Sequence, residues 1–173
     1  MLREYFFRTI QHLLGLFIFD APGLALFKTK IIGLFVTIGE GSYIAHRSML
    51  VKSHNPPNPK LVIGKNVGIE HECFIDYSGG VTIGDNVWVS EGAFIASHNH
   101  KIVTQHLKKE QEILFSDLVI GDDAWLGARC MILPNVKFIG KGAVVGAGSI
   151  VTKNVEDWAI VVGKTAKVIG YRK

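Results

Sequence analysis

Aliphatic residues recur at every sixth position along most of the chain, in groups of three, and glycine follows the first member of each group. A helix repeats about every 3.6 residues and a strand every second residue, so neither element alone produces this spacing. Six residues suffice for one short strand and a corner, and three such units close a triangular coil. The pattern therefore predicts stacked coils with the aliphatic side chains inside. The periodic positions are Ile38, Ile44 and Leu50; Ile63, Ile69 and Ile75; Ile83, Val89 and Ile95; Ile120, Leu126 and Ile132; Ile139, Val145 and Val151.

Four interruptions break this period, and two of them are long. A regular stack of coils gives no reason for such breaks, so they point to function. Nineteen extra residues follow Ile95, and we predict an extruded, functional loop over 97–116. Seven extra residues follow Leu50, in a stretch rich in proline and asparagine that contains His54. This stretch is predicted to loop out of the coil.

The two shorter interruptions predict local changes only. Two extra residues follow Ile75, and Gly79 and Gly80 mark them as a turn. One extra residue follows Ile132, which predicts a bulge near Phe138.

Residues 1–36 are strongly apolar but do not fit a membrane span. The longest uncharged run, Thr9 to Phe19, has eleven residues, whereas a span needs about 20. A secretory signal does not fit either, because an acidic residue lies in the would-be basic region. We predict a helix over 2–19, a stop at 20–23 and a second apolar piece. The helix either packs over the end of the coils or, through residues 1–27, contacts a membrane surface. The membrane interpretation uses Phe6, Phe7, Leu14 and Phe17.

The composition excludes some classes of protein. With 48% apolar and 20% charged residues and a mean hydropathy of +0.27, disorder is excluded for most of the chain. A net charge of +4 suits a small anionic ligand better than a nucleic acid. Cys73 and Cys130 lie 57 residues apart without a metal-binding motif, and we expect two buried, reduced thiols.

Several repeats have closely similar sequences: LVIGKN, VTIGDN and LVIGDD, with a closing run WLGARCMILPNVKFIGKGAVVGAGSIVTK. In these motifs the chain resembles the hexapeptide-repeat acyltransferases. The resemblance implies an all-β fold, a left-handed parallel β-helix, over residues 37–169, between the apolar helical segment 1–36 and a C-terminal tail, 170–173. It also implies a homotrimer with active sites between subunits. Within this family the chain is most similar to bacterial polysaccharide and sugar O-acetyltransferases.

His98 is the predicted catalytic base, because it lies where the regular coil gives way to the long loop. Histidine titrates near neutrality, which suits proton transfer. The family's catalytic histidine also begins such a loop after small residues, as Ala96 and Ser97 precede His98 here. His98 would take the proton of an acceptor hydroxyl while that oxygen attacks the thioester carbonyl of acetyl-CoA. Backbone N–H groups would stabilise the oxyanion that forms. His100 points the same way in an extended segment and stays open as the alternative base.

The acceptor is predicted to bind on the preceding coil, which carries an unusual polar cluster. Asp76 is a candidate to bind a sugar hydroxyl or to stabilise the imidazolium of the base, and both roles stay open. Glu70 and Glu72 are candidates too, with a solvated edge as the alternative. The predicted acceptor-binding residues are Asp76, Glu70 and His100.

For the donor, small residues on stacked turns leave room for the thin pantetheine arm of coenzyme A, although coil corners favour such residues in any case. By resemblance, the residues on the pantetheine side are Trp125, Ala128 and Ala147, with Gly127 beside them, and those at the phosphate and adenosine end are Thr152, Lys153 and Lys167. The run from Gly163 to Lys167 departs from the Gly-Asn-Pro-Ala that precedes the family's basic residue, which leaves the adenosine contacts less defined.

The leading hypothesis is an acetyl-CoA-dependent O-acetyltransferase that modifies a sugar hydroxyl in capsule, exopolysaccharide or lipopolysaccharide biosynthesis. It would be cytoplasmic or peripheral at the inner face of the membrane, would bind a sugar or glycan precursor rather than nucleic acid, and would need no metal. Two alternatives stay open. One is a γ-class carbonic anhydrase-like metalloenzyme, for which His71, His98, His100 and His106 supply the ligand type. The other is a catalytically inactive β-helix scaffold.

Overall fold

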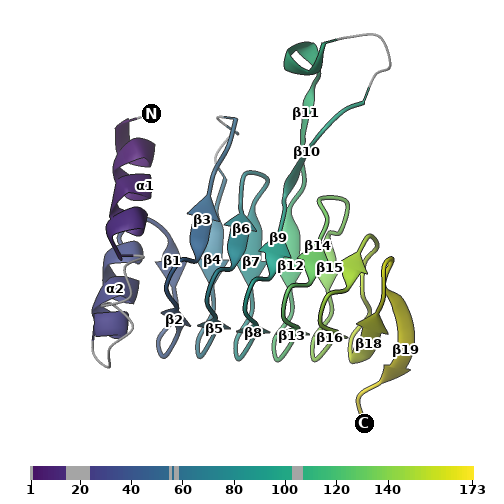
Figure 1. Ribbon diagram of the computed structural model, residues 1–173. Helices are drawn as coiled ribbons and strands as arrows, with labels where there is room; N and C mark the ends of the chain where they lie inside the picture. Colours follow the sequence, from purple (N-terminus) through teal and green to yellow (C-terminus); the bar gives the residue numbers. More distant parts are fainter. Residues whose placement is uncertain (1, 15–23, 55, 57–58, 103–106) are drawn as a thin grey trace.

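The computed structural model describes residues 2–14, 24–54, 56, 59–102 and 107–173. From Thr37 onward the chain winds into stacked coils that form a row in Figure 1. The coils build three sheets of short strands stacked in parallel. The predicted all-β fold, a left-handed parallel β-helix, is confirmed.

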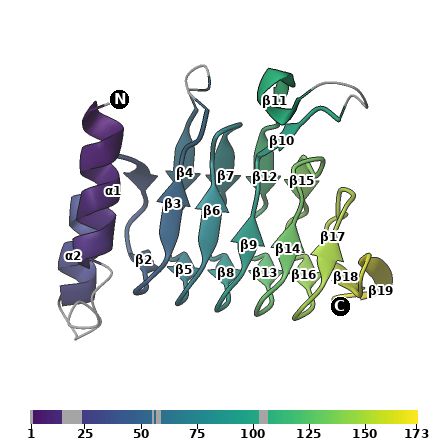
Figure 2. The same ribbon diagram turned by 45° about the horizontal axis from the view of Figure 1, so that its top comes forward.

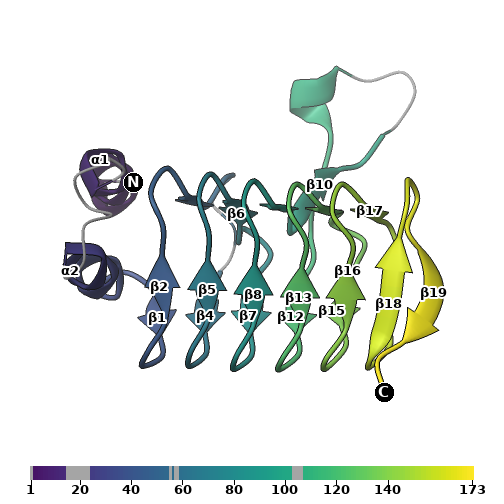
Figure 3. The same ribbon diagram turned by 60° about the horizontal axis from the view of Figure 1, so that its bottom comes forward.

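Sheets A, B and C form the three faces of the coil. Sheet A contains β1 (Thr37–Ile38), β4 (Leu61–Ile63), β7 (Val81–Ile83), β12 (Leu118–Ile120) and β15 (Phe138–Ile139). Sheet B, which Figure 3 shows from β2 to β19, contains β2 (Tyr43–Ile44), β5 (Gly68–Ile69), β8 (Trp88–Val89), β13 (Trp125–Leu126), β16 (Val144–Val145), β18 (Ala159–Val162) and β19 (Lys167–Tyr171). Sheet C contains β3 (Met49–Val51), β6 (Phe74–Asp76), β9 (Phe94–Ile95), β14 (Met131–Ile132) and β17 (Ile150–Val151). Outside the coil lie β10 (His98–His100), the 3₁₀ helix η2 (Lys108–Glu110) and β11 (Ile113–Phe115).

The periodic aliphatic residues fill the interior of the coil. In sheet A, Ile63, Ile83 and Ile120 pair in register and are almost completely buried. Because each coil covers the apolar side chains of its neighbours, the loss of water from these surfaces holds the stack together. The glycine after the first member of each group has a steric reason: a Cβ on Gly64 would lie 2.6 Å from the carbonyl oxygen of Gly84. Corners stacked this closely leave no space for a side chain.

Two helices, α1 (Leu2–Leu14) and α2 (Leu24–Ile32), cover the first coil at one end of the row (Figures 1 and 2). The α1 helix is the first part of the helix predicted over 2–19, and the remainder lies outside the described residues. Gln11 donates to the carbonyl oxygen of Leu50 and accepts from its N–H, at 2.9 and 2.8 Å. The buried amide therefore satisfies backbone groups at the open end of sheet C, as a cap must.

The packing of α1 decides part of the membrane prediction. Phe7 and Leu14, which were candidates for membrane insertion, are buried in the core, so this part of the prediction is wrong. The apolar face of α1 packs against apolar side chains of the coil. Phe6 is exposed, Phe17 lies outside the described residues, and contact of residues 1–27 with a membrane stays a prediction. In the described part of the chain, no helix is both long and apolar enough to cross a membrane.

The C-terminus is more structured than predicted. A tail was expected at 170–173, but β19 continues to Tyr171 and pairs antiparallel with β18 over the last coil. Arg172 then donates from its backbone N–H to the carbonyl oxygen of Trp158, at 2.8 Å, and its guanidinium lies 3.0 Å from the carboxylate of Asp123. The boundary was wrong because the hexapeptide period ends before this closing hairpin.

The bulge predicted near Phe138 is also wrong. Phe138 pairs in regular parallel register with Val119. The extra residue instead enlarges the preceding corner, where Asn154 Oδ1 accepts hydrogen bonds from the backbone N–H groups of Lys137 and Phe138, at 2.8 and 3.3 Å. A side-chain acceptor thus replaces the missing backbone partners.

Both thiols are expected to resist modification in the native protein. Cys73 and Cys130 are free and buried, and burial raises the pKa of Cys73 to about 11 and that of Cys130 to about 12. Since the thiolate is the reactive form, very little of it exists near pH 8. A thiol reagent at pH 8 should label neither cysteine in the folded protein and both in denaturant. Rapid labelling of the folded chain would show that the coil opens locally.

Candidate active site

All four interruptions of the period fall at one corner of the triangle, where the chain passes from sheet C to sheet A. We call it the CA corner. The excursion after β3, the turn after β6 and the hairpin after β9 follow one another on successive coils, and they project from the same edge in Figures 1 and 2. Loops that are separated in sequence by most of a coil therefore become neighbours in space.

The hairpin that carries His98 is anchored to the coil before it. At its base, the N–H of Ser116 donates to the carbonyl oxygen of Ser97 at 2.9 Å, and β10 pairs antiparallel with β11 beyond this point. Ser97 is completely buried. Its hydroxyl donates to the carbonyl oxygen of Asp76 at 2.7 Å and accepts from the N–H of Gly79 at 2.9 Å. The residue after Ser97 is therefore held by a fixed base.

His98 forms a short contact with a buried carboxylate. Its Nδ1 lies 2.6 Å from Oδ2 of Asp76, and the two side chains are 19% and 3% exposed. The oxygens of Asp76 also accept hydrogen bonds from the N–H and hydroxyl of Ser78, at 3.1 and 2.5 Å, and from the N–H of Ser97, at 3.1 Å. A carboxylate accepts, so Nδ1 of His98 is the donor and Nε2 keeps its lone pair.

This geometry bears on the two roles that the sequence left open for Asp76. Its carboxylate is buried, and each oxygen already has protein donors. Direct binding of a sugar hydroxyl by Asp76 would require one of these donors to be displaced, and it stays a prediction. The geometry fits the other role, which is to fix the ring of His98 and stabilise its protonated form.

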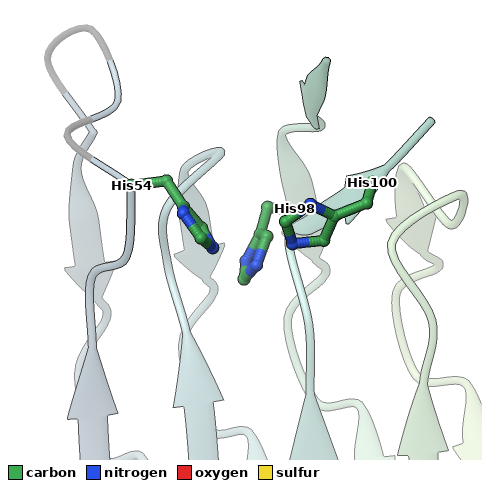
Figure 4. A group of neighbouring side chains, drawn as sticks. All are labelled: His54, His98 and His100. Atoms are coloured by element: carbon green, nitrogen blue, oxygen red, sulfur yellow. The ribbon is translucent and has the colours of Figure 1, made fainter. Parts of the chain in front are cut away.

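Two further histidines surround His98. His54, from the excursion after β3, and His100, from β10, lie with their ring centroids 5.0 and 5.7 Å from that of His98. The rings of His54 and His100 are also 5.0 Å apart. Figure 4 shows the three rings converging from two separate loops. Loss of water around the ring and the nearby charges of His98 and His100 lower the pKa of His54, because both disfavour its cationic form.

His54 was not among the site residues predicted from the sequence. The spacing of the repeats could have indicated it. The excursion with His54 and the loop with His98 both follow the third member of a group, so both leave the coil at the same corner. The other two histidines that the sequence offered as metal ligands do not join this cluster in the described residues. His71 lies in another part of the coil, against the ring of His46 at 4.3 Å, and His106 lies outside the described residues.

Glu70 and Glu72 are not part of this site within one chain. Both follow β5 at the corner between sheets B and C, which we call the BC corner. Glu70 accepts a hydrogen bond from the hydroxyl of Tyr43, whose pKa is raised to about 12 by desolvation and by this carboxylate. Glu72 pairs with the exposed Arg47 at 3.2 Å. Within one chain Glu70 and His98 lie apart, because the second and third members of a group end at different corners. That Glu70 binds the acceptor stays a prediction for a site between subunits.

Part of the predicted donor site forms a continuous column at the BC corner. The N–H of Gly148 donates to the carbonyl oxygen of Ala128 at 2.8 Å, so the turns that carry Ala128 and Ala147 stack directly. Both alanines are exposed, and a Cβ on Gly127 would lie 2.6 Å from a backbone oxygen. Trp125 is exposed on sheet B just before this column. An exposed edge of small residues leaves room for a thin, amide-bearing ligand.

The other predicted donor residues lie elsewhere. Thr152 and Lys153 follow β17 at the CA corner, two coils beyond His98. Lys167 is exposed in β19, paired with Val162. Within one chain, sheet C therefore separates the column of small residues from His98, Thr152 and Lys153.

Replacing Gly79 with Ala is expected to displace the base of the hairpin. The added Cβ would lie 2.2 Å from the carbonyl oxygen of Ser97 and 2.4 Å from the nitrogen of Ser116. Both are backbone atoms, so relieving the clash requires the backbone itself to move. We expect the free energy of unfolding, measured by urea titration, to fall by about 1–3 kcal/mol. Gly170→Ala is the matched control, since nothing lies within 4 Å of its Cβ. Equal stabilities of the two variants would contradict this tight contact.

Comparisons with known proteins match the repeats and the fold. The bacterial transferase hexapeptide family (six repeats) matches residues 117–153, and the hexapeptide repeat of succinyl-transferase matches residues 60–97. Galactoside O-acetyltransferase of Escherichia coli (strain K12) is 31% identical over 136 residues, which is 79% of this chain and 64% of the relative. The chain spans less than two thirds of the length of this relative and of other curated relatives that it matches.

Solved structures superpose over almost the whole chain. A galactoside acetyltransferase in complex with coenzyme A is 25% identical with a TM-score of 0.80, over 97% of this chain and 80% of that one. A maltose O-acetyltransferase from Clostridium difficile 630 is 24% identical with a TM-score of 0.83, over 98% and 86%. The second match supports the fold alone.

Proposed function

Because the chain belongs to the hexapeptide-repeat acyltransferase family, we propose that it transfers an acetyl group from acetyl-CoA to a sugar hydroxyl, with His98 as general base. The observation that carries this proposal is the contact between His98 and the buried Asp76 at 2.6 Å, at the base of the extruded hairpin. A base held in one tautomer beside an accessible loop is what direct acyl transfer requires.

The proton transfers follow from this geometry. Nε2 of His98 accepts the proton of the acceptor hydroxyl while that oxygen attacks the thioester carbonyl supplied by acetyl-CoA. Asp76 stabilises the imidazolium that forms, as a buried carboxylate does for a histidine base. When the carbon–sulfur bond breaks, the imidazolium returns the proton to the leaving thiolate. His98 is then neutral again, and no covalent bond to the protein is formed.

The sugar acceptor is supported by the names of two relatives, a galactoside O-acetyltransferase and a maltose O-acetyltransferase. The relatives also include chloramphenicol acetyltransferases, so the acceptor class needs a direct test. We keep synthesis of capsule, exopolysaccharide or lipopolysaccharide as the proposed pathway, and its monosaccharide units define the first acceptors to try.

We propose a homotrimer as the active form. In one chain, sheet C separates His98 from the small-residue column at Ala128 and Ala147, whereas a site between two subunits would bring one chain's column beside the other chain's base. Exposed Trp88 and Trp125 on sheet B supply apolar surface for association. Light scattering after gel filtration should give three chain masses, and a stable monomer with full activity would contradict the proposal.

The test of function is an acceptor screen. Purified protein, acetyl-CoA and a panel of hexoses, disaccharides and nucleotide sugars are incubated, and acetylated products are identified by mass spectrometry. We expect a product with an alkali-labile acetyl ester and none from the His98→Asn variant. Acetylation of amino sugars on nitrogen alone, or no transfer to any hydroxyl, would contradict the proposal.

A further inference from the structure

His54, His98 and His100 bring three imidazoles together at the CA corner. Each offers one ring nitrogen, and these nitrogens lie within 4.8 Å of one another. The rings belong to two separate loops and point toward a common space in Figure 4. Of the three rings, only that of His98 takes part in the proposed proton transfers, which therefore do not account for the convergence of the other two.

The spacing is close to that of a metal-binding triad. Around tetrahedral zinc, with Zn–N distances of about 2.0–2.1 Å, ligand nitrogens lie about 3.3–3.4 Å apart. Closing the observed set to that spacing needs movements of about 1.5 Å or less. His54 and His100 are exposed side chains that can move this far by rotation about their side-chain bonds, while His98 stays fixed. Three ligands leave the fourth position to water.

His98 is already oriented as a metal ligand would be. Its Nδ1 contacts the buried carboxylate of Asp76, which leaves Nε2 for coordination. Histidine ligands in metal sites typically donate their other N–H to a carboxylate, which fixes the ring and strengthens it as a donor. All three rings belong to one chain, so the cluster of histidines forms without contacts between subunits.

We infer that His54, His98 and His100 form a binding site for a divalent transition-metal ion of the zinc class, and that the bound ion stops acetyl transfer. Coordination uses the lone pair on Nε2 of His98, which is the same pair that must accept the proton of the acceptor. Metal binding and base catalysis therefore exclude each other. The metal site stands on the geometry alone, whereas the inhibition rests on the proposed function.

Direct binding is the first test. Tag-free, chelator-treated protein without coenzyme A is titrated with Zn²⁺ by calorimetry, and with Co²⁺ while visible absorption is recorded, because tetrahedral cobalt absorbs strongly. We expect one Zn²⁺ per chain. His54→Asn and His100→Asn should each weaken zinc binding at least about tenfold, since each removes one of three ligands. His12→Asn, on the exposed part of α1, is the matched control and should bind zinc as the wild type does.

Circular dichroism of each variant shows that it is folded before its affinity is compared. The absence of saturable zinc binding in the wild type would overturn the site. So would equal affinities of His54→Asn and the wild type, which would place the ion on other residues.

Inhibition is measured separately, by mass spectrometry of the acetylated product, because the free thiol of coenzyme A itself binds zinc. One equivalent of Zn²⁺ should reduce turnover at least tenfold, a chelator should restore it, and His54→Asn should need at least tenfold more zinc for the same loss. Undiminished or faster turnover of the zinc-loaded protein would overturn the inhibition. Absence of turnover in the metal-free protein would instead count against the proposed function, with the binding result unaffected.

Discussion

Replacing His98 with Asn is expected to lower kcat by about 10²- to 10⁴-fold, because the acceptor hydroxyl loses the group that removes its proton. Asn is similar in size and keeps a polar group beside Asp76, so the hairpin should stay in place. The dissociation constant for acetyl-CoA should change little, since His98 acts on the acceptor. Steady-state kinetics together with a calorimetric titration of the donor measure both quantities.

His100→Asn is the matched control for this prediction. His100 is exposed on β10, and its ring centroid lies 5.7 Å from that of His98. The carboxylate of Asp76 contacts His98, Ser78 and Ser97. We expect kcat of His100→Asn to stay within about tenfold of the wild type. If His100→Asn shows the large loss and His98→Asn does not, His100 is the base and the proposed role of Asp76 fails with it.

Replacing Asp76 with Asn is expected to lower kcat by about 10²-fold or more, although Asp76 touches no substrate. Its oxygens accept from His98, Ser78 and Ser97, so an amide N–H₂ placed at either oxygen meets a donor. Where the N–H₂ of the new amide faces His98, two donors oppose each other unless Nδ1 of His98 gives up its hydrogen and accepts instead. The ring hydrogen then lies on Nε2. In that tautomer His98 cannot accept a proton from the acceptor hydroxyl.

Nitrogen chemical shifts of the His98 ring report this change of tautomer directly, and a purely structural role of Asp76 would not produce it. Asp85→Asn is the control, because Asp85 is an exposed corner residue whose Oδ1 accepts from the N–H of Lys65. A folded Asp76→Asn variant with wild-type kcat would show that His98 does not depend on this carboxylate.

The sequence predicts the coil well because all its interior positions share one requirement. Each periodic residue, such as Ile63 or Ile95, needs only to be aliphatic and correctly spaced to stack on its counterparts. The ends of the coil obey no such period. The burial of Phe7 and the closing strand that reaches Tyr171 depend on how separate elements pack, and neither leaves a regular signal in the sequence.

The site was predicted in part for a related reason. His98 and Asp76 follow from their positions at the breaks in the period. Within one chain Glu70 lies away from His98, because a residue after the second member of a group lies at a different corner from a residue after the third. His54 was missed because 44 residues separate it from His98 and only the stacking of coils brings them together. Assigning each residue to a corner before looking for clusters would have shown both relations.

A calorimetric titration of the chelator-treated protein with acetyl-CoA tests most directly whether this chain uses that donor, without any assumption about the acceptor. We predict saturable binding with one site per chain and a dissociation constant in the range of about 1 μM to 1 mM. No binding at millimolar acetyl-CoA would contradict the account. It would direct attention to the metal-binding and scaffold alternatives.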